Sequence, residues 1–284
     1  MYVQRLRIEN IRAIRHLDLS LDEYEQAGWH VILGENGAGK SSVIRALALV
    51  LVGSENAHAL RQDWSRWIPT NSKEGHIEVT LRQHKEDAWK GKGRQSKGAI
   101  RAETTIGIDK SVSKRATIHF SSGNVDRTVH GGGNGWFSAS FGPFRRFSGG
   151  DPDVERLYLT HPRLAPHLSA FGENVALTEC LRWLRELQFR SLEDDSDATA
   201  VRDAVVDFIN AAGLLPHCSR IEEIRSDEIV VIDGQGRKVA VEELSDGYRS
   251  ILSLTFELLR QMFVVFGTER TLGAMDSKNG LIDL

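Results

Sequence analysis

The sequence is poor in cysteine and proline and holds no long apolar run. Two of its 284 residues are cysteine and six are proline, which excludes a disulfide framework and the collagen-like and low-complexity classes. No stretch approaches the ~18 consecutive apolar residues that a membrane span requires. The first ten residues, MYVQRLRIEN, interleave charged with apolar side chains and are not typical of a signal peptide. We therefore expect a soluble cytoplasmic protein with no membrane partner.

Charge is distributed unevenly along the chain. The net charge is only −3, but residues 1–150 carry 22 Lys and Arg against 15 Asp and Glu, whereas residues 151–284 carry 14 against 24. With 40% hydrophobic residues, the chain is long enough for one large α/β domain or two small ones. The charge split predicts an anion-facing first half and an acidic second half. The anion could be a nucleotide, a nucleic acid or an acidic face of a partner.

The hydrophobic pattern predicts a mixed α/β fold. Alternating or continuous apolar runs predict strands at 5–8, 16–21, 29–33, 76–83, 99–109 and 116–122, and a hairpin of 229–232 with 239–241. Helical periodicity predicts helices at 41–51, 174–192, 197–212 and 246–266. The helices at 174–192 and 197–212 do not keep a heptad pattern for three repeats. We therefore expect a small antiparallel β subdomain and a short helical lobe, with no long coiled coil.

A phosphate-loop motif stands at the junction of a predicted strand and a predicted helix. Residues 34–41, GENGAGKS, match the pattern G-x-x-x-x-G-K-[ST] without a mismatch. Glycines let successive backbone N–H groups point at a phosphate, and the following helix presents its positive end to the same anion. Lys40 is expected to reach the β- and γ-phosphates, and the hydroxyl of Ser41 to bind Mg²⁺. The predicted nucleotide-binding residues are Gly34, Asn36, Gly37, Ala38, Gly39, Lys40, Ser41 and Ser42.

A second motif lies 205 residues after Lys40. Residues 243–250, ELSDGYRS, open the apolar helix predicted at 246–266. Together, GENGAGKSS and LSDGY resemble the ABC-type ATPase heads of the branch that holds RecF, SMC and the overcoming-lysogenization-defect ATPases. The resemblance implies a P-loop NTPase fold in which Ser245 and the N–H of Gly247 contact the γ-phosphate bound by a second subunit. Without that resemblance, Ser245 is read as a plain helix N-cap.

The form of the second motif narrows the resemblance. Asp246 and Tyr248 stand where the common LSGGQ signature has Gly and Gln, and this version is similar to the small PtuA-like ATPases of Septu and retron antiphage systems. The element NIRAI at residues 10–14 resembles a segment that places a basic residue near the adenine, which assigns Arg12 to the nucleotide. A plain exposed strand-end charge is the alternative for Arg12.

The resemblance implies cofactors, partners and an activity. ATP and Mg²⁺ are the expected cofactors, and a homodimer or higher oligomer is expected to enclose two nucleotides head to tail. The expected function is ATP hydrolysis that gates a nuclease or other effector protein in antiphage defence, with DNA or RNA as a further possible partner. One alternative is a RecF-like ATPase of DNA repair or recombination. Another is a non-hydrolysing, ATP-dependent assembly module.

One element of such an ATPase is not recognised in the sequence. An apolar strand ending in Asp-Glu, the Walker B element, should follow the signature helix, but Leu281-Ile282-Asp283 has neither the strand before it nor a Glu after it. We therefore name no catalytic glutamate. We expect either that the chain is truncated, that another chain completes the hydrolytic site, or that the protein binds ATP only as a switch. The expected division is an ATP-binding lobe with the β subdomain at 1–150 and a helical and signature lobe at 151–284.

Two further segments carry weaker signals. Basic residues cluster around Trp89, namely Lys85, Lys90, Lys92, Arg94 and Lys97; a solvated loop is the favoured interpretation and a nucleic-acid contact the alternative. In residues 141–147, three Phe flank Arg145 and Arg146, which fits core aromatics beside surface arginines about as well as a nucleotide or partner contact.

Overall fold

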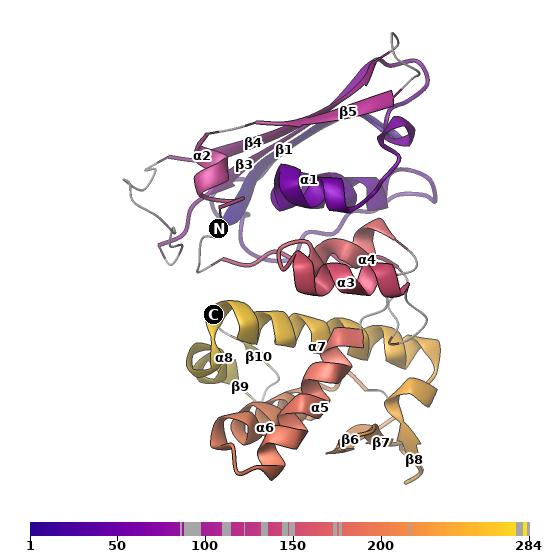
Figure 1. Ribbon diagram of the computed structural model, residues 1–284, viewed down its shortest axis with the longest axis vertical. Helices are drawn as coiled ribbons and strands as arrows, with labels where there is room; N and C mark the ends of the chain where they lie inside the picture. Colours follow the sequence, from indigo (N-terminus) through magenta and orange to yellow (C-terminus); the bar gives the residue numbers. More distant parts are fainter. Residues whose placement is uncertain are drawn as a thin grey trace. The chain divides into compact units, whose positions relative to one another are not determined.

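The chain divides into two compact units, described here from a computed structural model (Figure 1). The first unit holds Met1–Ser140 and His161–Phe171, and the second holds Phe141–Thr160 and Gly172–Leu284. The boundary predicted at residue 150 thus differs from the observed division, because residues 161–171 return to the first unit. The structure describes residues 1–85, 87, 98–109, 115–121, 123–131, 136–143, 147, 151–172, 175, 178–215, 217–276 and 281–282.

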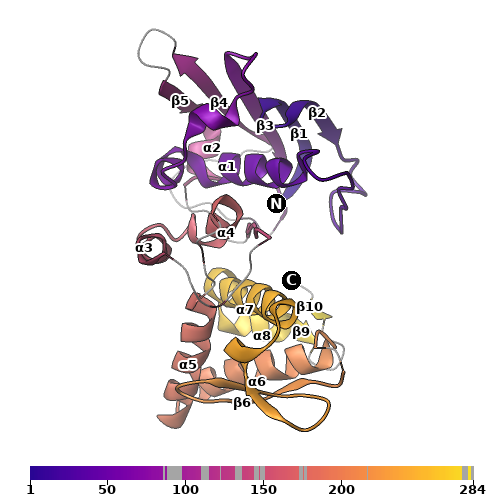
Figure 2. The ribbon, with the colours of Figure 1, turned by 90° about the vertical axis from the view of Figure 1, so that its right-hand side faces the viewer.

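A five-stranded sheet forms one layer of the first unit (Figures 1 and 2). Its strands are β1 (Tyr2–Ile11), β2 (Ile14–Ser20), β3 (Glu74–Arg82), β4 (Ile100–Asp109) and β5 (Arg115–Phe120). Their order is β2-β1-β3-β4-β5, and every strand pair among the described residues of this sheet is antiparallel. Alternate residues of β1 and β3 are buried, as expected for strands with one face on a core. The predicted antiparallel sheet is confirmed.

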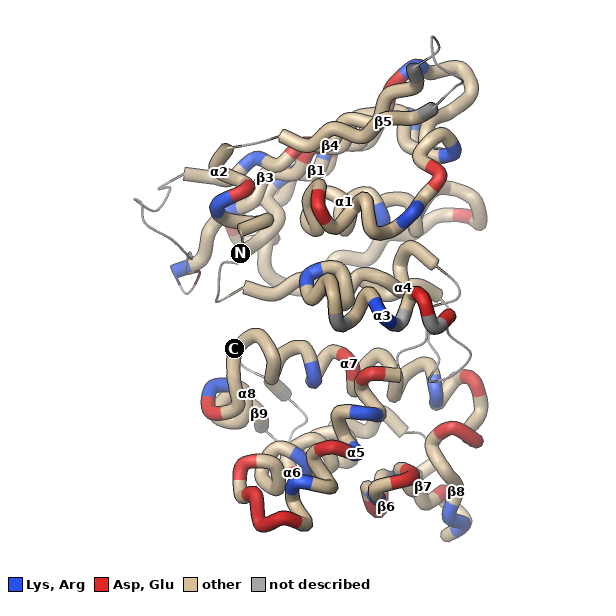
Figure 3. Tube along the Cα trace, in the orientation of Figure 1, with Lys and Arg blue, Asp and Glu red and all other residues tan. Residues whose placement is uncertain are grey.

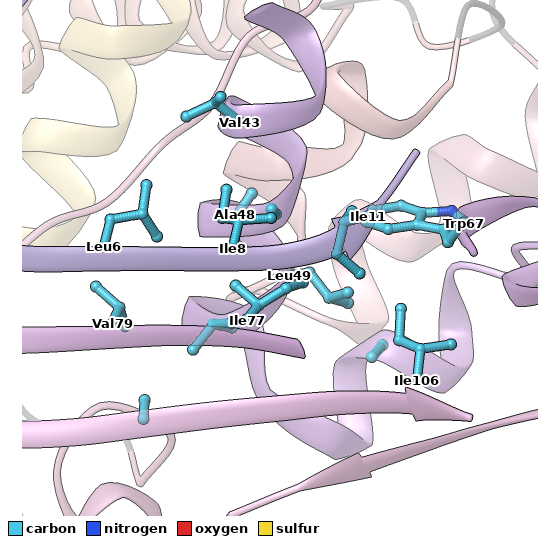
Figure 4. Close-up of a cluster of buried hydrophobic side chains, with 14 of the residues drawn as sticks. Leu6, Ile8, Ile11, Val43, Ala48, Leu49, Trp67, Ile77, Val79 and Ile106 are labelled. Atoms are coloured by element: carbon cyan, nitrogen blue, oxygen red, sulfur yellow. The ribbon is translucent and has the colours of Figure 1, made fainter. Parts of the chain in front are cut away.

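The helix α1 (Lys40–Ala59) packs against one face of this sheet. Apolar side chains from β1, β3, β4 and α1 interdigitate in one core cluster (Figure 4). The helix breaks at Gly53, whose φ of 78° and ψ of 174° are not helical. The His130 ring sits at this break, and its Nε2 lies 2.8 Å from the carbonyl oxygen of Val50. The unit also contains η1 (Trp64–Trp67), α2 (Asn124–Arg127), η2 (Ala165–His167) and α4 (Leu168–Phe171).

Helices dominate the second unit. They are α3 (Pro152–Thr160), α5 (Thr178–Leu192), α6 (Ser196–Ala211), η3 (Val241–Glu243), α7 (Asp246–Phe266) and α8 (Thr268–Ala274). A three-stranded antiparallel sheet is formed by β6 (Arg220–Ile224), β7 (Ile229–Ile232) and β8 (Lys238–Ala240). A short pair joins β9 (Met275–Asp276) to β10 (Leu281–Ile282). The predicted helices near 174–192, 197–212 and 246–266 and the predicted hairpin are all present.

The charge imbalance of the sequence also separates the two units, and their helices are short. The second unit carries 15 Lys and Arg against 24 Asp and Glu, and the first unit 21 against 15. Acidic residues gather where α5 joins α6 (Figure 3). The longest helix in the described ranges is α7, with 21 residues, so a mixed α/β fold with no long coiled coil is confirmed for that part. None of the described helices is both long and apolar enough to cross a membrane.

The strand predicted at 29–33 does not form. These residues have no regular structure, and Trp29 and Leu33 are 99% and 87% exposed. The prediction of a strand buried on both faces is therefore wrong for this structure. A continuous apolar run becomes a buried strand only when neighbouring strands satisfy its N–H and C=O groups. Residues 29–33 pair with none of the described strands.

Candidate nucleotide-binding site

The GENGAGKS segment forms a turn that leads directly into α1. Gly37 and Gly39 have φ values of 87° and 100°, a left-handed conformation that glycine adopts without a Cβ clash. The amide of Ala38 donates to the carbonyl of Glu35 at 3.2 Å, and the amide of Ser42 donates to that of Gly39 at 2.8 Å. The first N–H groups of a helix have no partner inside it. The loop therefore leads directly into the positive end of α1.

Gly39 fixes the loop against the hairpin of β1 and β2. A Cβ at Gly39 would lie 3.0 Å from Cγ1 of Ile14 and 3.7 Å from Cβ of Ala13. At Gly34 a Cβ would come within 3.3 Å of the Cβ of Ala38. Both glycines thus allow a close approach that a side chain would disturb. The packing at Ile14 joins elements that are 25 residues apart in the sequence.

Three polar side chains of the loop lie at the start of α1. The ammonium of Lys40 donates to the carbonyls of Gly34 and Glu35, both at 2.7 Å, so its charge lies over the loop. Ser41 is exposed, whereas Ser42 is buried at the start of the helix. An exposed hydroxyl next to this lysine fits a magnesium ligand, and the lysine and the open amides fit a polyphosphate.

Arg12 stands on the turn that contacts the loop. Its φ is 53°, its amide donates to the carbonyl of Trp67 at 2.7 Å, and its guanidinium lies 5.5 Å from the centre of the Trp67 ring. Burial, and then the charge of Arg45, lower the pKa of Arg12. Arg12 is therefore anchored on an aromatic ring beside Ala13 and Ile14. The contacts with Trp67 were not visible in the sequence, because they join residues 55 positions apart.

The second motif forms the N-terminus of α7 in the second unit. Ser245 is the N-cap residue, and its side chain makes no capping bond. Ser245 and Gly247 are exposed, and a Cβ at Gly247 would meet no atom within 4 Å. The side chain of Asp246 is 94% exposed and is bound by Arg249, which also donates to the carbonyl of Glu242 at 3.3 Å. The N-cap position of Ser245 is thus confirmed, but its hydroxyl does not hydrogen-bond to the helix.

A metal-ligand cluster that the sequence did not reveal lies on the sheet. His76 and Glu78 on β3 and Glu103 on β4 bring their ligand atoms within 4.8 Å of one another. The guanidinium of Arg101 binds Glu78 and Glu103, each at 2.5 Å. Directly opposed carboxylates repel each other across a strand pair, and Arg101 balances their charge. The cluster is therefore explained as an ion-pair network.

The weaker sequence signals are settled only in part. Of the basic cluster, Lys85 is described and exposed; Trp89, Lys90, Lys92, Arg94 and Lys97 lie outside the described residues. Phe144, Arg145 and Arg146 also lie outside them. Phe147 is 3% exposed and packs on Phe256 with 6.2 Å between ring centres, which supports a core role for this aromatic.

Comparison with known proteins supports the class of the first unit. Residues 5–135, slightly under half of the chain, match the family model described as AAA domain (AAA_23). The Septu protein PtuA of Bacillus mycoides is 32% identical over 83 residues, which span 28% of this chain and 12% of that protein. The predicted similarity to small PtuA-like ATPases is confirmed by the second match. The first match covers the whole predicted phosphate loop.

Two groups of solved structures are similar at low identity. An SMC head bound to the C-terminal winged-helix domain of ScpA has a TM-score of 0.49 and 14% identity, covering 93% of this chain and 77% of that one. The recombination mediator RecF with ATP has a TM-score of 0.39 and 11% identity, covering 98% of this chain and 87% of that one.

Proposed function

We propose that this protein binds ATP with Mg²⁺ at the loop of residues 34–41 and uses the nucleotide to join two subunits. The observation that carries the proposal is the loop itself. Its glycines, the start of α1 and the Lys40 ammonium converge on one exposed turn within the segment that matches an AAA domain. Bound Mg²⁺ would offset phosphate charge, with Ser41 as its protein ligand. The amides and Lys40 would orient the β- and γ-phosphates.

The exposed N-terminus of α7 supports the second half of the proposal. Ser245 and Gly247 are exposed, and the Ser245 side chain makes no capping bond to the helix. A helix N-terminus favours an anion, so a γ-phosphate held by one subunit could be bound by α7 of another. ATP would then stabilise the dimer by mass action, and its loss would release the subunits.

The output that we propose is control of an effector, such as a nuclease, in antiphage defence. The support is the similarity to the Septu protein PtuA together with the LSDGY form of the second motif. Hydrolysis of ATP would reset the assembly. The partner could be a protein alone or a protein with DNA or RNA.

Mass photometry at increasing ATP concentration tests the dimer. The wild-type chain should shift from monomer to dimer with Mg·ATP, and Ser245→Arg should stay monomeric because the side chain fills the phosphate position. Ser226→Arg, at an exposed turn of the second unit, is the matched control and should dimerise. Dimers that form equally in both variants would contradict the role of α7.

Phosphate release then separates an ATPase from a binding switch. Steady-state release that disappears in Ser245→Arg supports hydrolysis in the dimer. Dimerisation without phosphate release would instead identify an ATP-dependent assembly module. DNA binding that needs no partner protein and weakens steeply with salt would favour a repair function.

A further inference from the structure

The two edges of the sheet in the first unit are protected differently. β2 forms one edge and carries Arg15, His16 and Asp18, and charged side chains on an edge oppose pairing with another strand. β5 forms the other edge and, among the described residues, pairs only with β4. Its sequence, RATIHF, has no Pro, Lys or carboxylate, and its six pairs with β4 run without a register shift. Among the described residues, β5 therefore has no strand partner on its outer side.

A groove of about 510 Å³ runs beside this edge. One wall is Ala116 to His119 of β5, and the other is residue 58 and residues 61–65. Four strand residues extend over ~13 Å at about 3.3 Å per residue. The groove thus follows the strand for the length of a short extended peptide.

The walls of the groove suit an additional strand. Ala116 and Ile118 are half-buried and pack on the core, whereas Thr117 and His119 are exposed on the other face. An added strand would continue this alternation. Trp64 lines the opposite wall and packs on Trp67, with 5.2 Å between their ring centres, so the groove has a fixed apolar surface.

Arg61 is the permanent cation of the groove lining. It is exposed, as are His58 and His119, and its side chain forms no ion pair with any described residue. The one carboxylate of the lining, Asp63, is already engaged. It accepts from the amide and hydroxyl of Ser65 at 3.1 and 2.5 Å and pairs with Arg66 at 3.1 Å.

We infer that the edge of β5 binds an extended, acidic segment of a partner protein by strand addition. Backbone hydrogen bonds to β5 would supply affinity, and Arg61 would select acidic side chains. This inference concerns a surface separate from the phosphate loop. It is tested without nucleotide, so its failure leaves the proposed ATP site untouched.

The test uses fluorescently labelled ten-residue peptides and fluorescence anisotropy. A peptide that alternates Thr and Glu should bind, because its carboxylates all lie on one face of the extended chain and can meet Arg61. The same peptide methylated on every backbone nitrogen keeps its charge but loses its backbone N–H donors. We expect its affinity to fall at least tenfold, and a Thr-Lys peptide should not bind. Hydrogen exchange at residues 115–120 should slow when the Thr-Glu peptide is bound.

Variants locate the site. Arg61→Glu should weaken the Thr-Glu peptide about tenfold, and Lys73→Glu, an exposed cation of the same unit outside the groove, should not. The thermal melting temperature of each variant checks its folding. Equal binding of the methylated peptide, no slowing of exchange at β5, or no binding of the Thr-Glu peptide below 1 mM overturns the inference. So does a dT10 oligonucleotide that binds where the peptide does not, because the groove then serves nucleic acid.

Discussion

Replacing Gly39 by alanine tests how the phosphate loop is held in place. Gly39 has a φ of 100°, and a Cβ would lie 3.0 Å from Cγ1 of Ile14. A left-handed conformation costs a non-glycine residue about 1–2 kcal/mol, and inserting a methyl into a packed site costs about 1–3 kcal/mol. We therefore expect Gly39→Ala to lower the free energy of unfolding by roughly 2–5 kcal/mol.

Two other glycines separate these two contributions. Gly37 has a φ of 87° and Gly236 a φ of 80°, and neither has an atom within 4 Å of a built Cβ. Gly37→Ala and Gly236→Ala should each lose only the backbone contribution, about 1–2 kcal/mol. ATP affinity should fall in the two loop variants, because their amides change direction, and stay unchanged in Gly236→Ala.

The assay is urea unfolding of each variant, together with a double-mutant cycle. Ile14→Ala removes the contacting Cγ1, so it should cost less in the Gly39→Ala background than in the wild type, by about 1 kcal/mol. Equal stability losses in Gly39→Ala and Gly37→Ala, with no coupling to Ile14, would refute the idea that the hairpin positions the loop.

Three further predictions concern stability, each measured by urea unfolding. His167 is fully buried, and burial lowers its pKa to about 4. The free energy of unfolding should therefore fall by roughly 3 kcal/mol as pH falls from 6.5 to 4, because the unfolded chain takes up the proton first. His167→Gln should flatten that part of the pH profile, and an unchanged slope would contradict this. Glu257 is 0% exposed and is bound by Arg260. Arg260→Met should therefore lower the free energy of unfolding by about 3–5 kcal/mol, and adding Glu257→Leu should restore most of that loss. Additive losses in the double variant would argue against a buried pair. Asp195 caps α6 by accepting a hydrogen bond from the amide of Ala198 at 3.0 Å. Asp195→Ala should therefore lower the free energy of unfolding by about 1 kcal/mol, and a loss near zero would contradict this role.

Sequence reasoning was strongest where the signal is local. The helix predicted at 246–266 has those bounds in the structure, because its apolar pattern and its N-cap serine lie within one segment. The strands β1 to β5 followed from alternation of apolar and polar residues. The turn of residues 34–41 into α1 was predictable for the same reason, since eight consecutive residues determine it.

Long-range packing was not predictable in this way. Residues 161–171 return to the first unit because Leu164, Ala170 and Phe171 are buried there, which no local pattern shows. The contact of Gly39 with Ile14 is likewise invisible to local sequence patterns. The strand predicted at 29–33 was wrong because an apolar run indicates burial without showing whether a neighbouring strand is present.

The most direct test of the central claim is calorimetric titration of Mg·ATP into the wild-type chain and two lysine variants. Lys40→Ala should weaken ATP binding at least about tenfold, because a hydrogen bond to a charged group contributes about 1.5–3 kcal/mol. Lys73→Ala, which removes an exposed lysine outside the loop, should bind as the wild type does. Equal ATP affinity of Lys40→Ala and wild type, or no binding by the wild type, would contradict the assignment of residues 34–41 as a nucleotide site.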